Sequence, residues 1–131
     1  MSELIGIVEE IYANFGRGNV DAIVETFAED IHFVHAGGPD IPYAKDRRGK
    51  SEAAAFFADL AAAVEVTSFE PRRYFERENA VMVVGHWSGR SRPAGRAFAS
   101  EWAMLWEFDG KKVKFYRAYE DTAAVAKAFA Q

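Results

Sequence analysis

Two polar side chains in the first third of the sequence could carry acid–base chemistry. His35 ends a predicted strand at residues 31–35. An imidazole takes up and releases a proton near neutral pH, so His35 could act as a general base. The alternative is a structural histidine that is hydrogen-bonded to a backbone carbonyl. Tyr12 lies in the apolar stripe of a predicted helix, where its phenol could stabilise a developing oxyanion or simply belong to the core.

Two further candidates, Arg117 and Asp121, lie near the carboxyl end of the chain. A turn of two or four residues within 109–112 would place both on the same sheet face as the tryptophans, whereas a three-residue turn would reverse the faces. Arg117 would then pair with a carboxylate or bind an acidic group of a ligand. Asp121 is the nearest acidic partner for Arg117, but it is also a natural N-cap for the last predicted helix.

Bulky side chains alternate along the predicted strand at residues 96–108, so Ser100, Trp102, Met104 and Trp106 share one face. We expect this face to look toward the helices. Three tryptophans in 131 residues favour an apolar ligand, aromatic or polycyclic, that is recognised mainly by contact area. The alternative is that the same rings fill an ordinary core. The residues predicted to line the cavity are Tyr43, Phe56, Trp87, Trp102, Met104, Trp106 and Tyr119, with Tyr43 at its mouth.

The elements that position these residues follow from the hydrophobic periodicity. Helical spacing predicts helices at residues 3–15 and 19–28 and a third that begins at an N-cap Ser51 and ends near residue 64. A loop containing Gly37, Gly38, Pro39 and Pro42 precedes the third helix. A period of two predicts strands near 66–76, 80–88, 96–108 and 112–120, followed by a short helix that ends at Phe129. Helices followed by strands indicate an α+β fold in a single domain, residues 1–131.

Composition narrows the class of protein. There are no cysteines, and the net charge of −4 argues against a nucleic-acid partner. No apolar run approaches the roughly 20 residues of a membrane span, so we expect a cytoplasmic protein without a membrane partner. His32 and His35 point to opposite faces of their strand and therefore cannot bind one metal ion together. We predict neither a metal nor a cofactor.

Three stretches make the sequence similar to a known family. These are YANFGRGNVDAIVETFAEDIHFVH (12–35), RGKSEAAAFF (48–57) and WEFDGKKVKFYRAYED (106–121). They resemble the SnoaL-like and ketosteroid-isomerase-like members of the nuclear transport factor 2-like superfamily, over nearly the whole chain. The resemblance implies a cone, in which a curved, mostly antiparallel sheet wraps on three helices as a cystatin-like α+β barrel. It also implies a homodimer through the convex sheet face, with Ala103, Leu105, Tyr116 and Ala118 as contacts.

The resemblance to ketosteroid isomerases is incomplete at the working residues. A tyrosine on the first helix matches Tyr12, but the position of the basic carboxylate falls on His35. The position of a protonated aspartate falls on Met104, which cannot donate a hydrogen bond to an oxyanion. Ketosteroid isomerisation itself is therefore not expected.

Three functions remain compatible with the sequence. The first is acid–base isomerisation, cyclisation or dehydration of an apolar substrate, with His35 as base and Tyr12 or Arg117 stabilising the anion. The second is a ligand-binding or assembly domain without catalysis. The third is water activation by Arg117 and Asp121, as in epoxide hydrolases of this fold.

Overall fold

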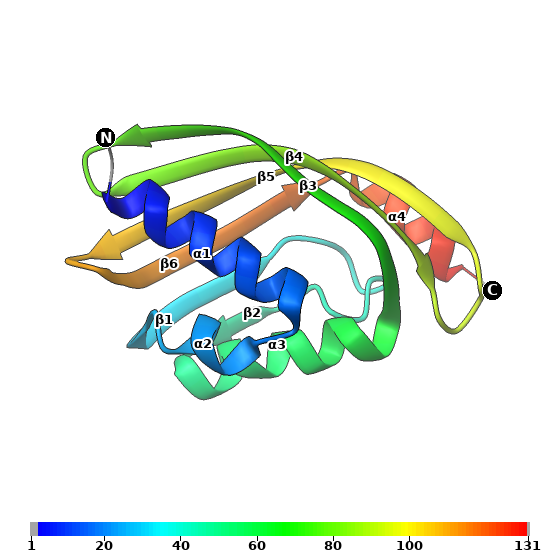
Figure 1. Ribbon diagram of the computed structural model, residues 1–131. Helices are drawn as coiled ribbons and strands as arrows, with labels where there is room; N and C mark the ends of the chain where they lie inside the picture. Colours follow the sequence, from blue (N-terminus) through cyan, green and yellow to red (C-terminus); the bar gives the residue numbers. More distant parts are fainter. Residues whose placement is uncertain (1–2, 131) are drawn as a thin grey trace.

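A computed structural model describes residues 3–130, which form a six-stranded curved sheet with four helices (Figure 1). The strand order is β2-β1-β6-β5-β4-β3. Only the β1–β6 pair is parallel among the strand pairs of this sheet. The helices are α1 (Glu3–Arg17), α2 (Val20–Val24), α3 (Lys50–Ala63) and α4 (Thr122–Phe129). The strands are β1 (Phe27–His35), β2 (Asp46–Arg48), β3 (Val64–Arg77), β4 (Ala80–Ser91), β5 (Ala97–Asp109) and β6 (Lys112–Glu120).

The helices occupy the concave side and one end of the sheet. In Figure 1, α1 crosses the concave face below β3 and β4, α3 closes the side near β1, and α4 lies beneath the far end of β4 and β5. The side chains between α1 and the sheet form a continuous apolar core. Ser100, Trp102 and Trp106 are buried in it, so the predicted inward direction of these even-numbered side chains is confirmed.

Most predicted elements are present, and the α+β architecture is confirmed. The Asn19 side chain caps α2, as its position predicts, but the helix ends at Val24, four residues early. The chain then enters β1 at Phe27, so this strand is longer than predicted. The predicted Ser51 cap is wrong: the N-cap of α3 is Gly49, which makes no side-chain bond. The three-residue strand β2 was not predicted.

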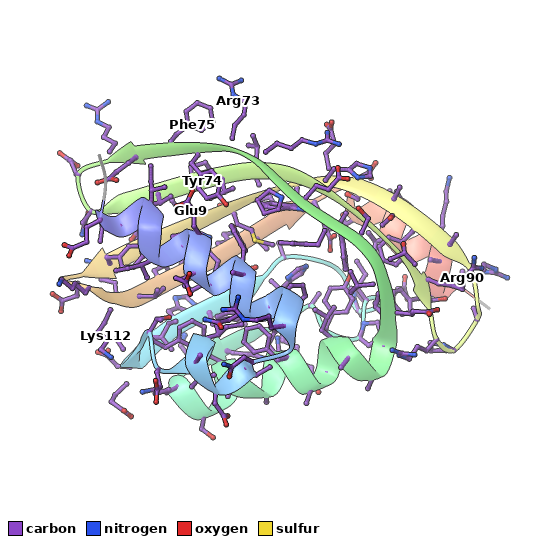
Figure 2. All side chains as sticks on the ribbon, in the orientation of Figure 1. Glu9, Arg73, Tyr74, Phe75, Arg90 and Lys112 are labelled. Atoms are coloured by element: carbon purple, nitrogen blue, oxygen red, sulfur yellow. The ribbon has the colours of Figure 1, made fainter. Side chains whose placement is uncertain are left out.

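The edge strand β3 carries side chains that alternate across the sheet. Pro71 lies on this edge next to a register shift, where a residue without a backbone N–H is tolerated. Figure 2 shows Arg73 and Phe75 pointing away from the molecule, while Tyr74 between them points to the side of α1 that carries Glu9. The Arg73 guanidinium lies 4.8 Å from the Phe75 ring centroid. Within the described range 3–130, no helix is long and apolar enough to cross a membrane.

Candidate functional site

The candidate site lies where β1, β6 and β5 run side by side. His35 is the last residue of β1, and it pairs with Ala118 of the parallel strand β6. Ala118 pairs in turn with Met104 of β5, and Glu120 pairs with Trp102. Directly paired residues share a sheet face. The side chains of His35, Glu120, Trp102 and Met104 therefore all project toward the helices.

A β-bulge determines which β6 residues face inward. The predicted two-residue turn is present, because Asp109 pairs with Lys112. The register then shifts, since Phe108 pairs with Val113 whereas Glu107 pairs with Phe115, and Lys114 is left as the extra residue. An extra residue reverses the faces beyond it. The prediction that Arg117 and Tyr119 share the tryptophan face is therefore wrong, and Tyr116, Ala118 and Glu120 take that place.

A buried histidine–carboxylate pair forms the centre of the site. His35 Nε2 lies 2.9 Å from Glu120 Oε2, and the two side chains are only 6% and 2% exposed. An ionised carboxylate can only accept hydrogen bonds, so the proton of this bond belongs to Nε2 of the imidazole. In the neutral imidazole, Nδ1 then carries the free lone pair. It is buried and has no hydrogen-bond partner.

Two further donors hold the Glu120 carboxylate. The Trp87 indole Nε1 donates to Oε1 over 2.9 Å. The Tyr43 hydroxyl donates to Oε2 over 3.4 Å. Burial and the neighbouring carboxylate raise the pKa of Tyr43 above its ordinary value, so the phenol keeps its proton. Three donors converging on one carboxylate compensate part of its lost hydration.

A buried arginine holds the loop that carries Tyr43. Arg47 Nη1 donates to the Tyr43 carbonyl over 3.0 Å, and Nη2 lies 2.5 Å from Asp59 Oδ2 on α3. Tyr43 is fully buried beside the His35 ring, with their centroids 4.9 Å apart. The prediction that Tyr43 closes the mouth of a cavity is therefore wrong. Its hydroxyl instead donates a hydrogen bond to the Glu120 carboxylate.

Tyr12 belongs to a second polar group on the same face. The Trp106 indole Nε1 donates to the Tyr12 hydroxyl over 3.0 Å, and that hydroxyl lies 3.3 Å from Met104 Sδ. A thioether is a weak acceptor, so the phenolic proton has only a poor partner. Burial raises the pKa of Tyr12 well above its ordinary value, which keeps the phenol protonated. Tyr12 can therefore donate to an oxygen that takes the place of the sulfur.

Two small cavities lie beside these polar groups, beneath an open cleft. One of about 50 Å³ is lined by Tyr12, Phe56, Met104 and Trp106 among others. The other, of about 30 Å³, is lined by His35, Trp87, Trp102, Met104, Tyr119 and Glu120 among others. The open cleft, of about 800 Å³, lies between α1, α3 and β3. Phe15 and Phe69 border all three spaces, with their ring centroids 5.2 Å apart, and separate the cleft from the cavities.

Several predicted site residues lie elsewhere. Arg117 lies on the outer face, with its guanidinium 5.2 Å from the ring of Tyr119. Tyr119 is 43% exposed, although it also borders the cavity of about 30 Å³, as predicted. The Asp121 carboxylate accepts from Ala124 N and caps α4. The two residues of the proposed water-activating pair therefore do not meet at the cavity.

The predicted contacts of the outer sheet face also need correction. Tyr116 and Ala118 are 3% and 1% exposed and belong to the core, because the bulge turns them inward. Ala103 and Leu105 lie on the outer face as predicted, since they alternate with the buried Trp102 and Trp106.

Sequence reasoning missed Glu120, Phe15 and Phe69. Regular alternation from the turn places Glu120 outside, and only its position next to the predicted cap Asp121 marks the strand end. Phe15 and Phe69 were assigned to a helix stripe and a strand without a role at the cavity. Among residues 3–130 no group of three or more His, Cys, Asp or Glu side chains could hold a metal ion.

Comparison with known proteins places this geometry among related folds. Residues 8–116 match the family of SnoaL-like domains. An NTF2-like protein from Burkholderia xenovorans is 31% identical, with a TM-score of 0.88 over 98% of this chain and 96% of that one. TerC, co-crystallised with polyporic acid, is 19% identical, with a TM-score of 0.86 over 98% of both chains. A Mesorhizobium loti protein named for a SnoaL-like polyketide cyclase is 15% identical, with a TM-score of 0.74 over 90% of this chain and 99% of that one. No curated protein matches the sequence.

Proposed function

Because this chain belongs to the SnoaL-like family, we propose that it is a general acid–base enzyme acting on a small, mostly apolar molecule. The reaction class is isomerisation, cyclisation or dehydration, with His35 as the base. One observation carries the proposal: the free Nδ1 belongs to a buried imidazole whose other nitrogen is held by a buried carboxylate, beside a cavity.

The energetics of the pair favour a catalytic role over a structural one. Burying a carboxylate costs several kcal/mol even when it is paired, and apolar side chains of similar volume often give a more stable core. The hydrogen bonds to Glu120 therefore add little to the free energy of unfolding. They do hold the imidazole in one tautomer with a lone pair free, which is what a general base needs.

Tyr12 supplies the complementary group. A base that removes a proton from a carbon or a hydroxyl group of the substrate leaves negative charge on an oxygen, and a preorganised donor in a dry site stabilises that charge. The Tyr12 hydroxyl is buried, protonated and polarised by the Trp106 N–H. Met104 lines both cavities, and its Sδ lies 3.3 Å from the Tyr12 hydroxyl.

Substrate would enter from the open cleft by displacing Phe15 and Phe69. Both rings are only partly buried, and they border the cleft as well as the cavities. An apolar ring system suits this path because the lining beyond the two phenylalanines is almost wholly aromatic and aliphatic. The co-crystal of TerC with polyporic acid supports a small organic ligand in this fold.

A second candidate function is ligand binding or assembly without catalysis. The small volumes of the two cavities, about 50 and 30 Å³, favour it, because neither holds a drug-sized molecule without movement of side chains. In that case the aromatic residues would serve as core, and the His35–Glu120 pair would be structural.

The test is proton abstraction from nitrobenzisoxazole, a flat apolar probe whose ring opens when a base removes its C–H proton. We expect the wild type to react faster than free imidazole at the same concentration. Changing His35→Gln should lower the rate about 100-fold, the usual contribution of a positioned base. His32→Gln is the matched control, because that histidine is partly exposed and bonds to the surface residue Asp46. Equal rates in the two variants, or a wild-type rate no faster than imidazole, would contradict the proposal.

A further inference from the structure

Two buried polar atoms without a hydrogen-bond partner belong to residues that line the same cavity. Among residues 3–130, the buried side-chain nitrogen and oxygen atoms without a hydrogen-bond partner are His35 Nδ1 and Trp102 Nε1. Both residues line the cavity of about 30 Å³, and they are 6% and 5% exposed. A buried donor or acceptor left unpaired costs about 1–3 kcal/mol, so two such atoms in one place call for an explanation.

The other two tryptophans show that the chain does satisfy buried indoles. Trp87 donates to Glu120, and Trp106 donates to the Tyr12 hydroxyl. Trp102 is also firmly held. Its ring stacks on Phe69 at 5.0 Å with an interplanar angle of 10°, and it packs so closely on Gly85 that an added Cβ would lie 2.5 Å from Trp102 Cζ2. The indole is therefore fixed with its N–H unused.

The two atoms have complementary chemistry. Trp102 Nε1 can only donate a hydrogen bond, while Nδ1 of the neutral His35 imidazole accepts one when Nε2–H donates to Glu120. A group that satisfies both must accept from one and donate to the other. A hydroxyl does this with a single oxygen. A ketone or ether oxygen has no proton for His35, and a carboxylate lacks one as well and would be repelled by Glu120.

The volume agrees with a single oxygen atom. A water-sized group needs about 10–15 Å³, so the cavity of about 30 Å³ accommodates a hydroxyl group. The carbon skeleton attached to it would lie in the neighbouring apolar cavity, which shares Phe15, Phe69 and Met104 with this one.

We infer that the cavity between His35 and Trp102 is a subsite for a hydroxyl group of the ligand, alcoholic, enolic or phenolic. This inference rests on the proposed function and narrows its substrate class. The O–H bond of the ligand breaks, its proton passes to His35 Nδ1, and the electron pair stays on the oxygen. The Trp102 N–H stabilises the resulting negative charge, and Nε2–H remains bonded to Glu120. Phenol is the simplest probe that carries such a group.

The experiment compares phenol with benzene, which differs only by the hydroxyl, by following the three tryptophan indole N–H signals in NMR spectra of the whole protein. Two added hydrogen bonds should make phenol bind about tenfold more tightly than benzene. Phenol should move the Trp102 signal, identified by its loss in Trp102→Phe, more than the already bonded signals of Trp87 and Trp106. In Trp102→Phe the preference for phenol should fall severalfold, and His35→Gln provides the same test from the acceptor side.

Equal affinities for phenol and benzene in the wild type would overturn the subsite, since the cavity would then keep a water molecule that phenol does not displace. This wild-type comparison needs no variant to fold. It is also independent of turnover, so its failure is distinct from failure of the proposed function. A wild type that does not open the nitrobenzisoxazole ring but still binds phenol more tightly than benzene would contradict the proposed catalysis and leave the subsite intact.

Discussion

Glu120 joins three side chains from distant parts of the sequence. His35 comes from β1, Tyr43 from the loop that follows β1, and Trp87 from β4, and each donates to the same carboxylate. Acidic residues are rarely buried in this way unless they are paired. The chemistry of His35 could be predicted from residue type and strand position. Its partner could not, because it depends on a register shift that no residue in β6 signals.

The buried tyrosines predict how stability depends on pH. Burial raises the pKa of Tyr12, Tyr43 and Tyr116 above the ordinary value of 10.0. The unfolded chain therefore releases these phenolic protons at lower pH than the folded chain does, so these three groups should leave the free energy of unfolding unchanged between about pH 7 and pH 9 and lower it above about pH 10. Each of the three protons should contribute a slope of up to about 1.4 kcal/mol per pH unit.

The measurement is urea unfolding at a series of alkaline pH values, with tyrosinate absorbance followed in parallel. Tyr43→Phe should give a shallower slope because it removes one of the three groups. Ionisation of Tyr12, Tyr43 and Tyr116 at their ordinary pKa while the protein stays folded would contradict the prediction.

At the scale of elements, the prediction from sequence succeeds where local chemistry decides. Asn19 and Asp121 cap their helices, and the connections at Glu78–Asn79 and Asp109–Gly110 are tight turns. It fails where a longer-range contact decides. The strand β2 forms because Asp46–Arg48 pair with β1. The bulge at Lys114 forms because the neighbours Glu107 and Phe108 of β5 pair with Phe115 and Val113, which are two residues apart on β6. Neither follows from periodicity within the segment itself.

The β3–β4 turn offers a stability prediction. Glu78 has a φ of 56°, a left-handed conformation that costs a residue with a Cβ about 1 kcal/mol. Glu78→Gly should therefore raise the free energy of unfolding by about 0.5–1 kcal/mol, measured by urea unfolding. Gly110→Ala is the matched opposite, since Gly110 has a φ of 61°, and it should lower the same quantity. A destabilised Glu78→Gly would mean that the glutamate side chain supports the turn.

At the scale of the whole molecule, the outer sheet face is the surface most suited to self-association. Phe75 and Tyr119 are 46% and 43% exposed there, and Ala103 and Leu105 lie on the same face. Figure 2 shows that Phe75 projects from this face beside Arg73. Exposed apolar patches rimmed by charge are typical of protein interfaces.

We predict a homodimer through this face, with Tyr116 and Ala118 excluded from it. Leu105→Glu should weaken dimerisation at least tenfold, because it places a charge in an apolar interface, and sedimentation equilibrium would report the change. Glu65→Gln, an exposed residue on the far part of β3, is the control. A wild type that sediments as a monomer at high concentration would rule the interface out.

The extra residue at Lys114 also bears on how such a chain can diverge. Loss of one codon there would restore regular pairing and leave the faces beyond it unchanged, because Phe115 would still pair with Glu107 and Glu120 with Trp102. A related chain that is one residue shorter at this point can therefore keep the His35–Glu120 pair without the bulge.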